Sequence, residues 1–232
     1  TDSGGVIKYP ELDFMNAQDF RILYLNDTIP VGDGTKNQDT GTIWLSHKDR
    51  NEYDGIEFDP TNNDVPKKGE PWNMWCDWQT KETGFDRFID KKKYNKIRDR
   101  QEAIQKCGKY LAHIQDNICG NFVGAEKVKA VQYLMYWMAD AIINPTKRRP
   151  AIALRGGQGT GKGLFVGKFA EFFGYHYRHI TQSNRLTDNF NWHLKDNLLL
   201  FSDEAFFAGD KAQAGMMKGL ITERTRMIEK KY

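Results

Sequence analysis

The stretch ALRGGQGTGKGLF, residues 153–165, has the spacing of a loop that binds phosphate. Gly156, Gly161 and Lys162 fit the pattern G-x-x-x-x-G-K, in which backbone N–H groups surround phosphate and the lysine reaches its outer oxygens. The sequence therefore predicts a nucleotide site. Its candidate binding residues are Gly156, Gly157, Gln158, Gly159, Thr160, Gly161, Lys162 and Gly163.

The segments on either side of the loop support this prediction. AIAL at 151–154 is an apolar run that predicts a buried strand, and KGLFVGKFAEFFG at 162–174 predicts a helix. Strand, glycine loop and helix N-terminus form the context that phosphate binding requires. The residues expected on or near the buried face of the helix are Leu164, Phe165, Phe169, Phe172 and Phe173.

A second element follows in NLLLFSDEAFF, residues 197–207. The apolar run 198–201 predicts a strand buried on both faces, with Asp203 and Glu204 at its carboxyl end. Open α/β sheets bind their ligands at that end. We therefore expect Asp203 to bind Mg²⁺, directly or through water, and Glu204 to polarise the attacking water, with Lys162 as the third catalytic residue.

The loop lacks the hydroxyl that normally follows the lysine, because Gly163 stands there. Our hypothesis is that the phosphates, water molecules and Asp203 hold the Mg²⁺ of bound ATP, since Mg²⁺ readily keeps several waters. Thr160 is a poor substitute for the missing ligand because of its place within the loop.

These signals predict an α/β fold with three regions. Residues 149–232 are expected to form part of a P-loop NTPase core, AAA+-like, with a parallel sheet. Residues 1–90 are an aromatic-rich mixed α/β front region, in which EYDGIEFDP at 52–60 suggests short strands around the turn dipeptide Asp54-Gly55. Residues 91–148 are helical.

The helical region is predicted from apolar residues that recur every three or four positions and end at Asn144-Pro145. We expect Met135 and Met138 to be core residues rather than part of a cofactor site. The residues that would share one helix face are Val128, Val131, Leu134, Met135, Met138 and Ile142. The following PTKRRP, residues 145–150, is a basic segment that we expect to act as a hinge before the nucleotide core.

Two features of the front half leave alternatives open. Trp72, Trp75 and Trp78 recur every third residue, which suits either a small core layer or a platform on which bases stack. KKKYNKIRDRQ at 91–101 carries six basic residues in eleven and suits either a solvated helix start or a phosphate-backbone contact.

Composition sets broad limits. The 232 residues are 39% apolar and carry a net charge of +3, so any nucleic-acid contact must come from local patches. Three cysteines without paired spacing suit a reducing compartment, and we expect a cytoplasmic protein. The sequence has no run of about 18 apolar residues and no signal peptide, so no membrane span is expected.

The histidines do not predict a metal centre. His176 and His179 are spaced like ligands, but no cysteine or carboxylate cluster accompanies them. We expect them, with His193, at surface or strand-end positions.

Several segments together resemble the helicase portion of phage and plasmid primase-helicases and the similar poxvirus-type enzymes among the superfamily 3 helicases. They are LRGGQGTGKGLFV (154–166), LLLFSDEAFFAGDK (198–211), KGLITERTRMIE (218–229), NEYDGIEFDP (51–60), NMW (73–75) and HIQDNICG (113–120). A glycine directly after the lysine also recurs in these similar enzymes, so the resemblance implies that Gly163 is a feature of the family.

The resemblance implies an ATP-driven motor. Such proteins form rings, here expected to be hexamers, that move along single-stranded DNA during replication, with ATP and Mg²⁺ as cofactors. Lys211 and Lys218 lie where the family has its DNA-facing element, and plain helix surface is the alternative for both. A primase centre is expected upstream, and a phage origin would place the protein in a bacterial cytoplasm.

The resemblance is incomplete at the C-terminal end. A polar sensor and an arginine finger come later in the family pattern, and Arg224 and Arg226 arrive too early to match that finger. Since an arginine finger accelerates hydrolysis by orders of magnitude, we expect the chain alone to be a weak ATPase. The alternatives to a helicase are a DNA-associated ATPase switch or loader that does not unwind, and a module that only binds.

Overall fold

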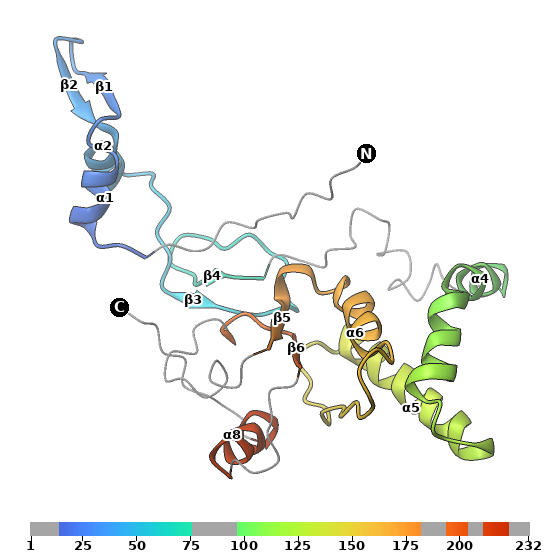
Figure 1. Cartoon of the computed structure of the whole chain (residues 1–232). Coiled ribbons are helices and arrows are strands. Elements are labelled where there is room, and N and C mark those ends of the chain that lie inside the picture. The colour runs from blue at the N-terminus through green and yellow to red at the C-terminus, as the bar shows by residue number, and fades with distance from the viewer. Residues whose placement is uncertain (1–13, 76–96, 182–193, 204–210, 223–232) are drawn as a thin grey trace. The chain divides into compact units, whose positions relative to one another are not determined.

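The computed structural model describes residues 14–75, 97–181, 194–203 and 211–222, with the side chains at 97–100 and at several positions of the last segment left aside (Figure 1). The chain divides into two compact units, 1–56 with 65–72, and 57–64 with 73–232. The expected boundary near residue 149 falls inside the second unit.

The first unit contains two short helices and a hairpin. Helix α1 (Ala17–Leu23) is followed by strands β1 (Thr28–Val31) and β2 (Lys36–Asp39), which pair antiparallel, and by helix α2 (Thr40–Ser46). Each helix begins at a side-chain cap. The Asn16 carboxamide accepts from the backbone N–H groups of Gln18 and Asp19 at 2.9 Å, and Asp39 accepts from Thr42 N–H at 2.7 Å.

Strands around Asp54-Gly55 are shorter than the alternation suggested. Strand β3 (Ile56–Glu57) has two residues, and its partner is β4 (Trp72–Asn73) rather than the segment before the turn dipeptide. Asn73 stabilises the loop between them, because its side-chain amide donates to the carbonyls of Asp59 and Asn62 at 2.9 Å.

The helical part of the second unit follows the predicted pattern closely. Helix α4 (Ile97–His113) continues into a π-helical turn, η2 (Ile114–Ile118), and α5 spans Gly124–Ile143. Met138 is buried in the core, as predicted, and Met135 packs against that core while remaining partly exposed. Leu134, on the same face, is buried as well. Val128 is 56% exposed, because the packed part of α5 begins at Ala130.

The basic segment after α5 is bonded to that helix. Arg149 donates from Nη2 to the carbonyls of Asp140 and Asn144 at 2.8 and 2.6 Å, and Lys147 Nζ lies 3.2 Å from Asp140 Oδ1. Hydrogen bonding from Asn144, and then from Lys147 and Arg149, lowers the pKa of the Asp140 carboxyl. Residues 147–149 thus cap the C-terminus of α5, where positive charge is favourable.

Helix α6 (Lys162–Ala170) starts where the sequence predicts and ends earlier. Phe165, Phe169 and Phe173 are buried in the core shared with α4 and α5, as predicted, whereas Leu164, expected on or near the buried face, is 58% exposed. Leu164 precedes Phe165 on the helix, and the neighbouring helices cover only the phenylalanine side.

The strand expected at 151–154 is not formed, since residues 151–157 have no regular secondary structure. Ile152 and Leu154 are half-buried against the core while Ala151 and Ala153 are exposed, so the side chains alternate as in a strand. The apolar signal was correct for burial. A strand also needs a partner, and the described strands of the chain pair with one another rather than with this segment.

Two parallel strands carry the rest of the unit. Strand β5 (Tyr177–Ile180) pairs in parallel with β6 (Leu199–Ser202), with Ile180 opposite Ser202. The predicted strand at 198–201 is confirmed with a shift of one residue. Helix α8 (Lys211–Thr222) packs Leu220 against buried Ile180. The full P-loop NTPase sheet stays a prediction.

A buried polar network holds the start of this sheet. His176 and Asp196 are both 0% exposed, and the imidazole Nδ1 donates to the Asp196 carbonyl at 2.9 Å. The Asp196 carboxylate lies 3.0 Å from Arg178 Nη2 and 3.4 Å from Lys195 Nζ. Of the two positions expected for His176, the strand end is the observed one, since His176 directly precedes β5, and these partners allow it to be buried there rather than exposed. His179 is exposed, and His193 lies outside the described residues.

The burial of His176 predicts a pH-dependent stability. Desolvation lowers the pKa of this imidazole below its ordinary value of 6.5, so the unfolded chain takes up a proton first as the pH falls. Stability contributed by neutral His176 is complete above pH 6.5 and is lost below it, by at most about 1.4 kcal/mol per pH unit. We expect the urea midpoint to fall between pH 7.5 and 5.5, and His176→Gln to flatten that slope.

The control for this measurement is His179→Gln, which removes an exposed histidine from the same strand. It should keep the wild-type slope. If His176→Gln also keeps that slope, the buried imidazole is not the titrating group.

Candidate functional site

The predicted phosphate loop leads directly into α6. Gly159 and Gly161 have φ angles of +78° and +80°, in the left-handed region that glycine adopts without strain. Gly161 is the residue before the first helical position, Lys162. Because the first N–H groups of a helix have no partner within it, this junction presents donors to an anion.

The side chain of Lys162 lies within the loop. Its ammonium donates to the carbonyls of Gly156 and Gly157 at 3.0 and 2.7 Å, and to Thr160 Oγ1 at 3.3 Å. Three acceptors match the three N–H bonds of the ammonium. The loop is therefore curled around this charge, and a phosphate oxygen could replace the neutral carbonyls in a stronger, charge-assisted hydrogen bond.

The position after Lys162 is open. Gly163 is exposed, and a Cβ added there would meet no atom within 4 Å. The Thr160 hydroxyl is used within the loop, since it donates to the Gly157 carbonyl at 3.0 Å and accepts from Lys162. The hydroxyl nearest in sequence thus has partners other than a metal ion.

Asp203 lies at the carboxyl end of the two parallel strands. Its backbone N–H donates to the carbonyl of Ile180 at 2.9 Å and so continues the β5–β6 ladder. Its carboxylate is 44% exposed and lies 3.9 Å from Nε2 of His179. Because it is exposed, this carboxylate is accessible to a metal ion at the carboxyl edge of the sheet. Glu204 lies outside the described residues. Among those described, no group of three or more metal-ligating side chains gathers.

Helix α8 carries the two lysines proposed for DNA. Lys218 is exposed, whereas the side chain of Lys211 is not described. Since Leu220 packs on the sheet, Lys218, two residues earlier, lies on a different side of the helix from that contact. Arg148 donates to the carbonyl of Thr222 at 3.0 Å and so holds the end of α8. Arg224 and Arg226 lie outside the described residues.

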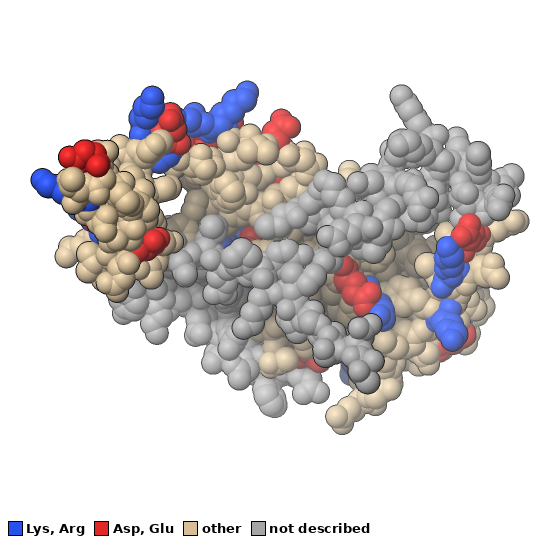
Figure 2. Space-filling model, turned by 90° about the horizontal axis from the view of Figure 1, so that it is seen from above, with Lys and Arg blue, Asp and Glu red and all other residues tan. Residues whose placement is uncertain are grey.

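The described charged side chains of the face seen in Figure 2 are mixed, with lysine and arginine beside aspartate and glutamate. This face therefore shows no single basic patch among them. Residues 91–96 of the basic run lie outside the described residues. Helix α4 begins at Ile97, and the side chains of residues 97–100 are not described.

The tryptophans near β4 have ring partners. Trp72 is 38% exposed and packs edge-on to Tyr53 with ring centroids 5.0 Å apart. Trp75 stacks on His176 at 4.6 Å and donates from Nε1 to Asn63 at 2.8 Å. Trp78 lies outside the described residues. The contacts of Trp75 fit the core-layer alternative, since its ring covers a buried histidine.

Sequence reasoning missed a contact between the helices and the loop. Nε2 of His113 lies 3.0 Å from the Gly161 carbonyl, and the Tyr110 hydroxyl donates to the Phe165 carbonyl at 2.9 Å. Nδ1 of His113 lies 2.9 Å from the side-chain nitrogen of Asn117. The spacing of these three residues places them on one helical face. No sequence signal identifies partners 48 and 55 positions away.

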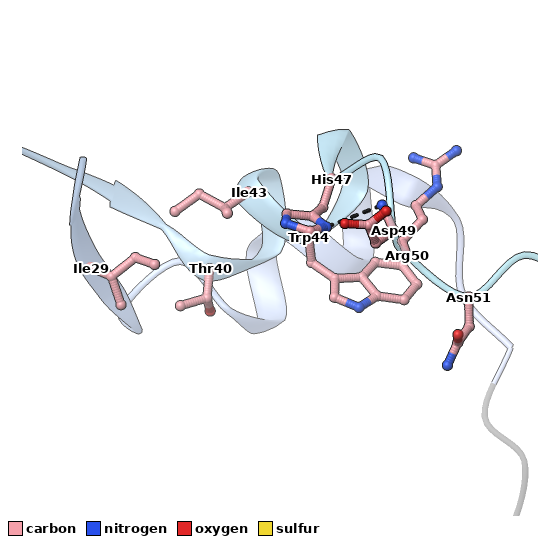
Figure 3. A pocket seen from close by; sticks show the side chains of 8 residues that line it. All are labelled: Ile29, Thr40, Ile43, Trp44, His47, Asp49, Arg50 and Asn51. Atoms are coloured by element: carbon pink, nitrogen blue, oxygen red, sulfur yellow. Dashed lines mark hydrogen bonds between the residues drawn. The ribbon is translucent and has the colours of Figure 1, made fainter. Parts of the chain in front are cut away.

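A hollow of about 410 Å³ lies in the first unit, and none of its lining residues is a predicted site residue (Figure 3). Its wall combines apolar side chains with His47, whose Nδ1 accepts from the Asp49 N–H at 3.2 Å. The lining residues are Ile29, Thr40, Ile43, Trp44, His47, Asp49, Arg50 and Asn51.

Comparison with known proteins gives one result for this region. A family model, described as a family of unknown function (DUF5906), matches residues 154–232, about a third of the chain. The matched segment contains the glycine loop, α6, both parallel strands and α8. The chain matches no curated protein and no solved structure. In the described ranges, no helix has the length and apolarity needed to cross a membrane.

Two neighbouring glycines should respond oppositely to alanine. In Gly161→Ala the new Cβ would overlap Cε1 of His113 and lie 2.8 Å from its Nε2, at a φ of +80°. We expect a loss of about 1–3 kcal/mol of stability. In Gly163→Ala the Cβ points into open space within a helix, so stability should rise by up to about 1 kcal/mol.

Urea unfolding of the two variants checks this pair of expectations. Each serves as the control of the other, because they differ in backbone conformation and in surroundings but not in chemistry. Equal midpoints would show that Gly161 does not need its left-handed conformation.

Proposed function

We propose that residues 156–163 bind the phosphates of ATP together with Mg²⁺, and that the chain is the helicase portion of a viral or mobile-element primase-helicase. The observation that carries the nucleotide site is the placement of the Lys162 ammonium. It is bonded to Gly156 and Gly157 carbonyls inside a glycine loop, directly at the N-terminus of α6.

The proposed chemistry assigns one task to each residue. The loop N–H groups and the start of α6 bind the phosphates, and Lys162 contacts the outer ones. Asp203, exposed at the end of β6, holds Mg²⁺ directly or through water. Glu204, next in sequence, polarises the attacking water.

The helicase assignment rests on the resemblance of the motifs to primase-helicases. Under this proposal the protein assembles as a hexameric ring on single-stranded DNA in a bacterial cytoplasm, linked to a primase centre upstream. Lys218 is exposed on α8 and free of the Leu220 packing contact, as a DNA-binding residue requires. Lys211 is the second proposed contact.

A switch or loader is the second proposed candidate function. It uses the same nucleotide site, and DNA would stimulate its ATP hydrolysis without strand separation. A duplex-unwinding assay distinguishes these two activities.

The first test compares two lysines of α6. Lys162→Ala removes a charged phosphate partner, and we expect ATP to bind about 10- to 100-fold more weakly. Lys168→Ala is the matched control, since Lys168 lies on the same helix and forms an exposed ion pair with Glu171 at 2.6 Å. Titration with a fluorescent ATP analogue measures both. ATP turnover is then followed with and without single-stranded DNA in a protein extended through the sensor and the arginine finger, because the chain alone is expected to be a weak ATPase.

Three outcomes bear on the proposal. Lost binding in Lys162→Ala alone, with turnover raised by DNA, supports a DNA-stimulated ATPase, and duplex unwinding then distinguishes the motor from the loader. Equal binding by all three proteins would refute the nucleotide site. Normal ATP binding with a turnover rate that DNA does not change would refute both proposed functions, the translocase and the loader.

The missing hydroxyl gives a separate prediction. Gly163→Thr adds an oxygen where the structure leaves space, so it should lower the Mg²⁺ concentration needed for half-maximal ATP binding. Gly163→Val is nearly isosteric with threonine but has no hydroxyl, and it should leave the Mg²⁺ titration unchanged. An unchanged titration in both variants would mean that another group already fills this coordination position.

A further inference from the structure

We propose that His113 is a positioning residue for the phosphate loop: its Nε2–H group holds the Gly161 carbonyl, and Asn117 fixes the tautomer that makes this possible. The inference deepens the proposed function and rests on it. His113 contacts the Gly161 carbonyl rather than the loop N–H groups that are proposed to bind phosphate. It acts through Gly161, the residue that joins the loop to α6.

The imidazole contacts Gly161 in two ways. Its Nε2 lies 3.0 Å from the carbonyl oxygen, and the same ring blocks the space that a Cβ on Gly161 would occupy. The carbonyl also accepts the N–H of Phe165 at 3.0 Å. One oxygen thus receives the first hydrogen bond of α6 and the bond from His113, which fixes the direction of the peptide group between Gly161 and Lys162.

The partners of the ring define its tautomer. A carbonyl can only accept, so Nε2 carries the hydrogen. Nδ1 is then an acceptor, and it lies 2.9 Å from the Asn117 side-chain nitrogen, which donates. Both contacts are satisfied by one neutral form of the ring, with the hydrogen on Nε2. With the hydrogen on Nδ1 instead, two donors would face each other at the Asn117 side-chain nitrogen, and two acceptors would face each other at the Gly161 carbonyl.

The helix that carries His113 is itself anchored in the core. Immediately after His113 the chain widens into a π-helical turn, in which Cys119 N–H donates to the Ile114 carbonyl at 2.8 Å. Ile114 is 0% exposed. One turn earlier, Tyr110 donates to the Phe165 carbonyl at 2.9 Å. Such π-helical turns are frequent at functional sites.

The two bonds from this helical face reach successive parts of α6. Tyr110 holds the helix at Phe165, and His113 holds it at its first carbonyl. A loop that keeps its bound shape before the ligand arrives loses less freedom on binding. Without His113, the loop would have to be ordered by the nucleotide, and affinity would fall.

The experiment compares His113→Leu with His113→Gln in the whole chain. Leucine fills much of the space without a donor, whereas the glutamine amide nitrogen can reach the position of Nε2. Fluorescent ADP binding and amide hydrogen exchange at residues 156–163 are measured in both. We expect His113→Leu to bind about tenfold more weakly and to exchange faster in the loop, and His113→Gln to restore both.

A spectroscopic readout tests the tautomer. In ¹⁵N-labelled protein, Nε2 of His113 should be protonated and Nδ1 unprotonated, and Asn117→Leu should mix the two forms. Similar urea midpoints in the His113 variants exclude a general loss of folding as the cause.

The outcomes separate this inference from the proposed function. Wild-type affinity and wild-type loop exchange in His113→Leu overturn the positioning role, even when Lys162→Ala loses ADP. A wild-type chain that binds no ADP refutes the proposed nucleotide site. In that case loop exchange alone decides, and an unchanged rate in His113→Leu overturns the positioning role as well.

Discussion

Phe165 and Phe169 carry α6 into the core that it shares with α4 and α5, and the geometry of the loop depends on this packing. The ring of Tyr110 lies nearly parallel to that of Phe165 at 6.0 Å, and Trp137 contacts Phe169 at 6.1 Å. Burying each phenylalanine contributes about 1.5–3 kcal/mol. With the helix fixed in this way, the position of its first turn is set, and Gly161 must take a left-handed conformation to bring the chain into it.

The sheet edge depends on a different kind of contact. Asp196 is fully buried, and a buried carboxylate is costly unless cations and donors surround it. Arg178 and Lys195 supply the charges, and the carbonyl of Asp196 accepts from His176. These bonds join the start of β5 to the segment before β6, so the two strands enter the sheet in register. Their carboxyl ends then meet, which places Asp203 beside His179. The position of the candidate metal ligand is therefore decided some seven residues before it in the sequence.

The sequence could predict what depends on local periodicity. The face of α5 through Leu134 and Met138, the first residue of α6 and the strand before Asp203 all follow from apolar spacing and from glycine. It could not predict what depends on distant partners. Leu164 has the character of a core residue but no neighbour to cover it, and 151–154 has the character of a strand but pairs with none of the described ones. His176 is buried because Asp196 and Trp75 surround it, and no spacing rule contains that information.

The same distinction explains why the sequence predicts the phosphate loop but not the contact of His113 with it. A phosphate loop is recognisable because glycine and lysine serve the ligand, whose chemistry is constant. The residue that holds such a loop serves this particular fold, and its identity depends on which helix lies behind Gly161. Here the acceptors of the contacts that hold the loop are neutral: the carbonyls of Gly156 and Gly157 accept from the Lys162 ammonium, and the Gly161 carbonyl accepts from the His113 imidazole. Lys162 thus provides the positive charge of this network, which a bound phosphate would contact. Among the described residues the acceptors of Lys162 are neutral, so the loop can be ordered in advance without weakening the attraction of this cation for an arriving phosphate.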